Sequence, residues 1–190
     1  MRITVKYSVL LPALIVALLA QDKTSQWKVF NSSAGFSVTY PADWFPKGIS
    51  TDRLTVLSSK KGAQATIIAG GEAMISVSEE EEPANQTMNE VVNRYLRDTT
   101  LVSRREIHIE GAASRSCKAL NEIVSKEGIV PPEDVAGRVP YVINTQYFCE
   151  IDSHIYVTVL RNFEGDRQQA LYVQIAQQMA KSLRVVQKVK

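Results

Sequence analysis

The spacing of the apolar residues changes along the chain, and this change constrains the fold more than any other feature. In the run Gly35–Tyr40, apolar and polar side chains alternate, which places one set on a single face of a half-buried strand. From Met88 to Leu96 the apolar residues instead recur every three or four positions, after the capping residues of 85–87. That spacing predicts an amphipathic helix of about three turns. The chain therefore combines strands with helices.

Further runs extend this pattern along the rest of the chain. Strands are predicted at Trp27–Asn31, Gly35–Tyr40, Arg53–Ser58, Ala63–Ala69, Glu72–Ser78, Arg104–Glu110, Ala112–Val124, Arg138–Ile151 and His154–Phe163. A final helix is predicted to start at Gly165-Asp166, with Gln169 as its capping-box partner. Its apolar stripe consists of Leu171, Tyr172, Ile175, Ala176, Met179 and Leu183. Because the connections have hairpin length, we expect a mainly antiparallel sheet packed with helices, which is an α+β fold.

The composition is that of an ordinary globular protein with one core of normal size. The 190 residues include 22 Lys and Arg against 20 Asp and Glu, 45% are hydrophobic, and 2 are Cys. These values exclude a collagen-like chain, a disordered charged tail and a small scaffold held by many disulfides. The basic residues form only the pairs Lys60-Lys61 and Arg104-Arg105, whereas nucleic-acid binding requires clustered cations. We therefore expect no nucleic-acid partner.

The N-terminal segment 1–20 has the pattern of a secretory signal peptide. Two basic residues precede an apolar stretch, Val9–Ala20, and polar residues resume directly after it. The stretch is too short to cross a hydrocarbon layer about 30 Å thick. We expect export, cleavage near Ala20, and a mature protein in the periplasm or outside the cell. The alternative is an uncleaved segment that tethers the protein to a membrane, because Leu18 is larger than the usual residue at that position.

A short motif at 35–44 has a direct physical interpretation. Pro41 lacks an N–H group and has a fixed φ, so it ends the strand that Tyr40 closes. Trp44 can then fold back over the edge of the sheet. We interpret this aromatic pair as a packing contact, because large aromatic side chains stabilise mainly through buried area, with a ligand platform as the alternative. The complete motif reads Gly35-Phe36-Ser37-Val38-Thr39-Tyr40-Pro41-Ala42-Asp43-Trp44.

The motif resembles the entry segment of the family that contains the PsbP oxygen-evolving-complex proteins, the Mog1 Ran-binding protein and many bacterial secreted or lipid-anchored relatives. A looser likeness extends over about 27–186. The resemblance implies a single PsbP/Mog1-like domain at 27–186, in which an antiparallel sheet lies between helical layers as an α/β/α sandwich. It also implies a non-catalytic binding or assembly module. The chain departs from the lipid-anchored relatives because Gln21, and no Cys, follows the apolar stretch.

The two cysteines, Cys117 and Cys149, are predicted to form a disulfide, which an oxidising extracytoplasmic compartment permits. If the strands that contain them pair antiparallel so that the two cysteines face each other, then Leu120 faces Gln146. Facing Cα atoms in such a pair lie about 4.5–5.5 Å apart, within the range for a disulfide. The alternative is two free, buried thiols, because Cys also serves as a small hydrophobic residue.

The sequence contains no catalytic or metal-binding signature. His108 and His154 lie in strand-like runs, and the His, Cys and carboxylate residues lack the spacings of a zinc site. A phosphate loop, a nucleophile elbow and a dinucleotide fingerprint are also missing. We therefore expect no enzymatic activity, no cofactor and no metal. The alternative is a hydrolase or another enzyme whose site is assembled from scattered residues such as His108, Glu110, Asp152 and His154.

Two segments are the best candidates for a binding surface. The first is the acidic segment 79–83, which contains Glu79-Glu80-Glu81-Glu82; its alternatives are a cation site and, more often, a solvated loop. The second is 128–140, which is longer than a hairpin requires and contains Pro131-Pro132 and Glu133-Asp134. Loops on a rigid scaffold concentrate recognition residues. We expect an unknown protein or a small ligand as the partner, and the alternative is that both segments are solvated connections.

Overall fold

The computed structural model describes residues 26–47, 53–58, 73–80, 86–128 and 141–186. The predicted signal segment 1–20, the predicted strand 63–69 and most of the two candidate binding segments lie outside the described residues. From those two segments, Glu79, Glu80 and Gly128 are described, whereas Glu81, Glu82 and Pro131 to Asp134 are not.

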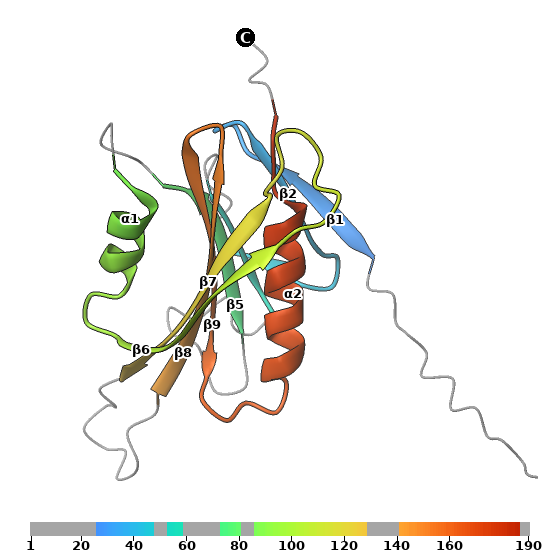
Figure 1. Ribbon diagram of the computed structural model, residues 1–190. Coiled ribbons are helices and arrows are strands. Elements are labelled where there is room, and N and C mark those ends of the chain that lie inside the picture. The colour runs from blue at the N-terminus through green and yellow to red at the C-terminus, as the bar shows by residue number, and fades with distance from the viewer. Residues whose placement is uncertain (1–25, 48–52, 59–72, 81–85, 129–140, 187–190) are drawn as a thin grey trace, which may run out of the picture.

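Seven of the described strands form one sheet, which is the centre of the fold (Figure 1). Every neighbouring pair in it is antiparallel, as the hairpin-length connections predict. One of these hairpins turns at Asp152 and Ser153, whose positive φ angles of 51° and 67° suit a tight hairpin turn. In order across the sheet, the strands are β3 (Phe45–Pro46), β4 (Arg53–Leu57), β5 (Met74–Glu79), β9 (His154–Phe163), β8 (Tyr141–Ile151), β7 (Ala119–Gly128) and β6 (Thr100–His108).

A smaller, three-stranded sheet is built around the motif at 35–44. Gly35 lies between its first two strands at φ 96°, a left-handed conformation that other residues adopt only with strain. The second strand ends at Pro41, and the buried Trp44 then packs edge-on against Tyr172, with ring centroids 5.9 Å apart. In order, the strands are β1 (Trp27–Asn31), β2 (Phe36–Pro41) and β10 (Arg184–Val185).

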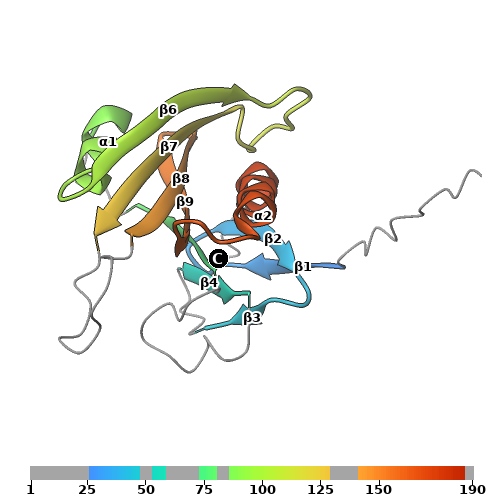
Figure 2. The ribbon, with the colours of Figure 1, turned by 90° about the horizontal axis from the view of Figure 1, so that it is seen from below.

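The two described helices lie on opposite faces of the seven-stranded sheet, as Figure 1 and Figure 2 show. The helix α2 (Gln169–Ser182) packs against β2, β8 and β9, and the helix α1 (Met88–Tyr95) packs against β8 from the other side. The fold is therefore α+β, with a mainly antiparallel sheet between helical layers, which confirms the predicted fold class. Neither of these helices has the length and apolar composition needed to cross a membrane.

Each face of the large sheet has its own apolar core. On the face that α2 covers, the α2 face, the core is continuous with the smaller sheet, where Phe36 contacts Tyr156 edge-on at 5.7 Å between ring centroids. On the opposite α1 face, the cluster is smaller. Its buried members are Val91, Val92, Ile123, Phe148, Ile155 and Val157.

The helix α1 is shorter than its apolar spacing predicts, with 8 residues instead of about three turns. It begins with a capping box: the Thr87 hydroxyl accepts from the Glu90 N–H at 3.4 Å, and the Glu90 carboxylate accepts from the Thr87 N–H at 2.7 Å. The hydrogen bond from the Thr87 backbone lowers the pKa of Glu90. The chain leaves the helix because the Thr99 N–H and hydroxyl both donate to the Leu96 carbonyl, in a turn that contains Asp98 at φ 66°.

The predicted start of the last helix was wrong. The helix α2 begins at Gln169 itself, and no side chain caps its first turn. The Asp166 carboxylate instead accepts a hydrogen bond at 2.8 Å from the N–H two residues later, within the turn that precedes the helix. Leu171, which the sequence placed in the buried stripe, is 50% exposed, whereas Tyr172 and Met179 are buried. The stripe is therefore narrower than predicted.

The predicted register around the cysteines was also wrong. The strand β7 covers Ala119–Gly128 instead of 112–124, and Ile123, not Leu120, faces Gln146 on β8. The reason is the segment before β7, which does not continue the strand. Its Ser116 forms an isolated bridge with Arg184 of the smaller sheet.

The cysteines nevertheless form the predicted bond. Cys117 lies just before β7, Cys149 lies on β8, and their Cα atoms are 5.8 Å apart in a disulfide. Both residues are buried in the core of the α2 face. The disulfide therefore fastens the segment that joins the two sheets to the middle of the large sheet.

Candidate functional site

Among the described elements, α1 covers the α1 face only in part, because α1 is short compared with the strands beneath it. At 1.5 Å per residue, α1 is about 12 Å long, whereas β8 with 11 residues extends for about 35 Å. Side chains alternate along β8, so that Tyr147 belongs to the α2-face core and Phe148 to the α1-face cluster. Asn144 and Gln146 therefore lie on the α1 face, and they continue the strand past the C-terminal end of α1.

A closed set of hydrogen bonds connects three strands on this part of the α1 face. The Arg161 guanidinium on β9 donates to the Glu127 carboxylate at 2.8 Å and to the side-chain Oδ1 of Asn144 at 3.1 Å. The Asn144 amide in turn donates to Glu127 at 3.3 Å. The Arg161 and Glu127 side chains are 35% and 41% exposed, so solvent screens this ion pair and it contributes little stability. The three side chains hold one another in a fixed orientation.

Beside this set, Gln146 is buried without a full complement of hydrogen bonds. The residue is 3% exposed, and its Oε1 atom has no partner among the described residues. The neighbouring Ser125 of β7, which faces Asn144, is fully buried and its hydroxyl is likewise unpartnered within the described part of the chain. A buried acceptor without a donor costs about 1–3 kcal/mol.

These residues form the floor of an open cavity of about 340 Å³. The floor consists of Glu127, Asn144, Gln146, Val159 and Arg161, and the wall is supplied by the end of α1 and the turn after it, through Tyr95, Arg97, Asp98 and Thr99. We call this feature the polar cavity. The turn at 96–99 reverses the chain and places polar side chains beside the cavity.

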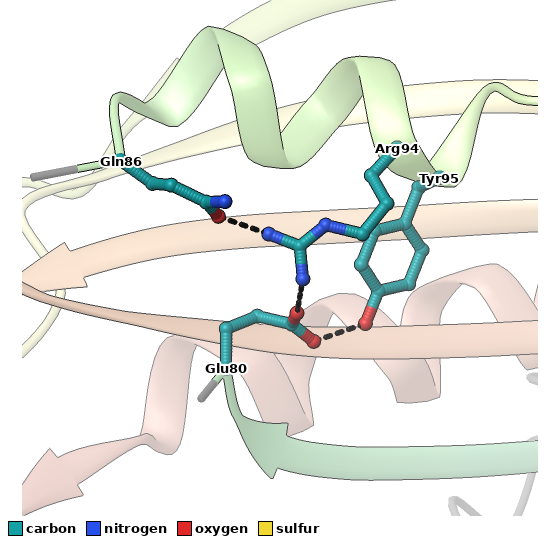
Figure 3. A network of polar contacts seen from close by, with 4 residues as sticks. All are labelled: Glu80, Gln86, Arg94 and Tyr95. Atoms are coloured by element: carbon teal, nitrogen blue, oxygen red, sulfur yellow. Dashed lines mark hydrogen bonds and ion pairs between the residues drawn. The ribbon is translucent and has the colours of Figure 1, made fainter. Parts of the chain in front are cut away.

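Glu80 connects α1 to the end of β5 through a set of polar contacts that Figure 3 shows. Its carboxylate accepts from Arg94 Nη1 at 3.3 Å and from the Tyr95 hydroxyl, while Arg94 also donates to the Gln86 side chain. Burial, together with the neighbouring Glu80 carboxylate, raises the pKa of Tyr95 above its usual value. Tyr95 is thereby held with its ring against Phe148 at 5.2 Å, where it also lines the polar cavity.

The described residues of the two candidate binding segments lie at opposite ends of the sheet. Glu79 faces Tyr156 at one end, whereas Gly128 faces Tyr141 at the other, next to Glu127 of the polar cavity. The described part of the acidic segment is engaged within the protein, because Glu80 contacts α1 and Glu79 pairs with His154 Nδ1 at 2.7 Å.

The structure does not bring together the four residues of the alternative enzyme site. His108 pairs with Glu106 at 3.2 Å on β6, and two strands, β7 and β8, separate it from His154 on β9. Asp152 instead lies 3.8 Å from Arg115, and Glu110 is exposed in the turn after β6. Within the described ranges, no three His, Cys, Asp or Glu side chains are grouped as metal ligands.

A buried carboxylate, that of Glu122, lies on the α2 face and is fully paired. Glu122 is 4% exposed and accepts from Arg105 at 2.5 and 2.9 Å. Burial, and then the nearby Glu122 charge, raises the pKa of Tyr147, whose hydroxyl donates to the Val173 carbonyl at 3.5 Å. Because each of these groups has a partner, this set stabilises the packing of the sheet and offers no open position to a ligand.

The polar cavity was not among the predicted sites, although the sequence contains one signal for it. The central strand 141–151 contains Asn144-Thr145-Gln146 between apolar residues, and buried strands seldom carry three polar residues in succession. The sequence does not show that Glu127 and Arg161, from two other strands, lie beside them. That convergence depends on the register of β7, β8 and β9.

Known structures show what kind of fold surrounds this site. No family model and no curated protein sequence matches the chain. The chain is similar to the Ran-binding protein Mog1p of Saccharomyces cerevisiae, at 12% identity and a TM-score of 0.50, over 85% of this chain and 96% of that protein. It is also similar to a Bacteroides thetaiotaomicron protein, at 13% identity and a TM-score of 0.50 over 87% of this chain, and it spans 50% of that protein's length.

A cyanobacterial PsbP from Synechocystis is a further similar structure, with 12% identity and a TM-score of 0.45 over 85% of this chain and 93% of that protein. At such identities, similarity in structure establishes the fold and nothing more. The similarity to Mog1p thus shows a Mog1-like fold, which agrees with what the resemblance of the motif at 35–44 implies.

Proposed function

We propose that this protein is an exported, non-catalytic binding module that holds a small polar ligand in the polar cavity. The observation that carries the proposal is Gln146, which is 3% exposed, lines the cavity and leaves Oε1 without a donor among the described residues. An apolar residue such as the neighbouring Phe148 or Ile123 would avoid that cost. A ligand that donates to Gln146 would offset it on binding.

The arrangement of the cavity supports binding more than catalysis. Glu127, Asn144 and Arg161 satisfy one another, which keeps them oriented but leaves no group activated as a nucleophile or as a general base. Cavities of this size, about 340 Å³, lie within the range of small-molecule sites. The pattern of polar groups therefore suits recognition of a small molecule.

Export is supported by the pattern of segment 1–20 and by the Cys117–Cys149 disulfide, because structural disulfides persist in oxidising compartments. N-terminal sequencing of protein recovered from the extracytoplasmic fraction tests this part. We expect the mature chain to start near Gln21. Intact Met1 on membrane-bound protein would contradict cleavage.

Native mass spectrometry of the mature protein, purified from its own host under mild conditions, tests the binding site. We expect a bound small molecule on the wild-type protein and its loss from Gln146→Leu, which removes the acceptor at nearly constant volume. The matched control is Gln174→Leu on the exposed side of α2, which lies on the other face of the sheet. The same bound mass on all three proteins, or no bound mass on any, would contradict the polar cavity as the working site.

A further inference from the structure

We propose that the ligand of the polar cavity is an uncharged, hydroxyl-rich molecule, namely a sugar unit. This inference rests on the proposed function and specifies its ligand class. It follows from three properties of the cavity: the balance of its charges, the kind of hydrogen-bonding groups on its floor, and the small apolar surface beside them.

The charges that line the cavity balance, so no net charge attracts an ion. Glu127 and Arg161 already form a pair at 2.8 Å on the floor. Arg97 and Asp98 are adjacent on the wall, and both are exposed to solvent. A charged ligand would have to compete with a counter-charge that already lies in place, at 2.8 Å, for either member of the pair. The cavity therefore favours an uncharged ligand.

The floor offers hydrogen-bond donors and acceptors side by side, which is the arrangement that hydroxyl groups require. Each hydroxyl both donates and accepts, and Gln146, the most buried lining residue, carries an acceptor that has no donor among the described residues. The Asn144 amide has two N–H groups and uses one of them toward Glu127. Vicinal hydroxyls of a sugar ring can thus bond to Gln146 and Asn144 at the same time.

The wall supplies an apolar surface of the right kind for the C–H face of a sugar ring. Tyr95 is held in place by its hydrogen bond to Glu80 and by the edge-on contact with Phe148, so its ring is oriented before any ligand binds. Val159 is the aliphatic side chain among the described lining residues. A peptide side chain would require a deeper apolar pocket as an anchor, and this pair of side chains does not form one.

The test is a titration followed by backbone amide resonances of the mature, disulfide-bonded protein. The probes are glucose and N-acetylglucosamine, each as the monosaccharide and as the tetrasaccharide, and a peptide probe, acetyl-glycyl-glycine amide, supplies amide groups without hydroxyls. We expect saturable shifts of Tyr95, Gln146 and Arg161 with at least one of the sugars. The affinity should fall about tenfold or more in Gln146→Leu and remain unchanged in Gln174→Leu.

Two kinds of result would overturn the sugar assignment. Shifts of the same amides with the peptide probe and with none of the sugars would overturn the sugar assignment and leave the polar cavity as a binding site. Shifts confined to other residues, or no shifts with any sugar, would also overturn the sugar assignment. The proposed function itself fails only if native mass spectrometry, too, shows no ligand that depends on Gln146.

Discussion

The two faces of the seven-stranded sheet differ in how completely they are covered. On the α2 face, a helix of 14 residues, about 21 Å long, packs together with the smaller sheet over a continuous apolar core. On the α1 face, a helix of 8 residues covers a smaller apolar cluster, and beyond its end the sheet carries Asn144, Gln146 and Arg161. The same strands thus contribute to a closed core on one side and to an open polar cavity on the other.

This difference separates a closed apolar core on one face of the sheet from an open polar surface on the other. Because side chains alternate along a strand, Tyr147 and Gln146 are neighbours in sequence but serve opposite faces. The α2 face can therefore supply most of the buried apolar area, while the α1 face tolerates an unpartnered Gln146. Substitutions on each face test whether the α2 face contributes more to the free energy of unfolding than the α1 face does.

The largest effect is expected from the disulfide on the α2 face. The double substitution Cys117→Ala and Cys149→Ala removes a cross-link between residues 32 positions apart. The chain-entropy model then gives a loss of about 3–4 kcal/mol in the free energy of unfolding. Urea denaturation of the oxidised wild type and the double variant measures this loss. Equal midpoints, or two alkylated thiols in non-reduced wild-type protein, would contradict a stabilising disulfide.

Alkaline pH should lower the free energy of unfolding, and it should do so mainly through tyrosines on the α2 face. Burial and the nearby Glu79 charge raise the pKa of Tyr156 to about 12, from 10.0. Burial likewise raises the pKa of Tyr147 on the same face and of Tyr95 on the other. Because the unfolded state loses these protons first, the free energy of unfolding is unaffected below about pH 10 and falls as pH rises toward 12.

Urea denaturation at a series of pH values measures this dependence, and phenylalanine variants assign it to a face. In the variants Tyr147→Phe and Tyr156→Phe, the free energy of unfolding should fall less steeply with pH above pH 10. The exposed Tyr141, changed to Phe, is the control and should leave the slope unchanged. The prediction would be contradicted if the free energy of unfolding fell with pH equally steeply in the wild type and in the phenylalanine variants of Tyr95, Tyr147 and Tyr156.

A moderate effect is expected where α1 is attached to the sheet. Tyr95→Phe keeps the ring contact with Phe148 but removes the hydroxyl that donates to Glu80. The loss should be about 1 kcal/mol, because one hydrogen bond to a charged, partly buried acceptor disappears. Thermal or urea unfolding of Tyr95→Phe and of the control Tyr141→Phe provides the comparison. A loss of equal size in both variants would show that the Glu80 contact contributes nothing specific.

The smallest effect is expected in the polar cavity, where a substitution should raise the free energy of unfolding instead of lowering it. Gln146→Leu removes a buried acceptor that has no donor among the described residues, so the free energy of unfolding should rise by up to about 1 kcal/mol. Gln174→Leu, on the exposed side of α2, should change it by less than about 0.5 kcal/mol. A clear loss of stability in Gln146→Leu would mean that Gln146 has a structural role on the α1 face.

Local patterns predicted the helices and strands well where the apolar residues of a segment keep a single spacing, either that of a strand or that of a helix. The strands Trp27–Asn31 and His154–Phe163 begin and end at the predicted residues, and the apolar spacing after Thr87 locates α1. The predicted boundaries of β7 were wrong, because the segment around Ser116 contacts the smaller sheet instead of continuing as a strand. A one-dimensional pattern cannot show such a contact between distant segments.

By itself, the sequence determined the fold class, the motif at 35–44 and the pair of cysteines, because alternation, fixed proline geometry and residue counts are local properties. Only the tertiary structure decided where the open surface lies. The polar cavity requires the register of three strands, which brings Glu127, Asn144 and Arg161 together, and the early end of α1, which leaves them uncovered. Both depend on contacts between residues far apart in the chain, and no spacing along the sequence specifies them.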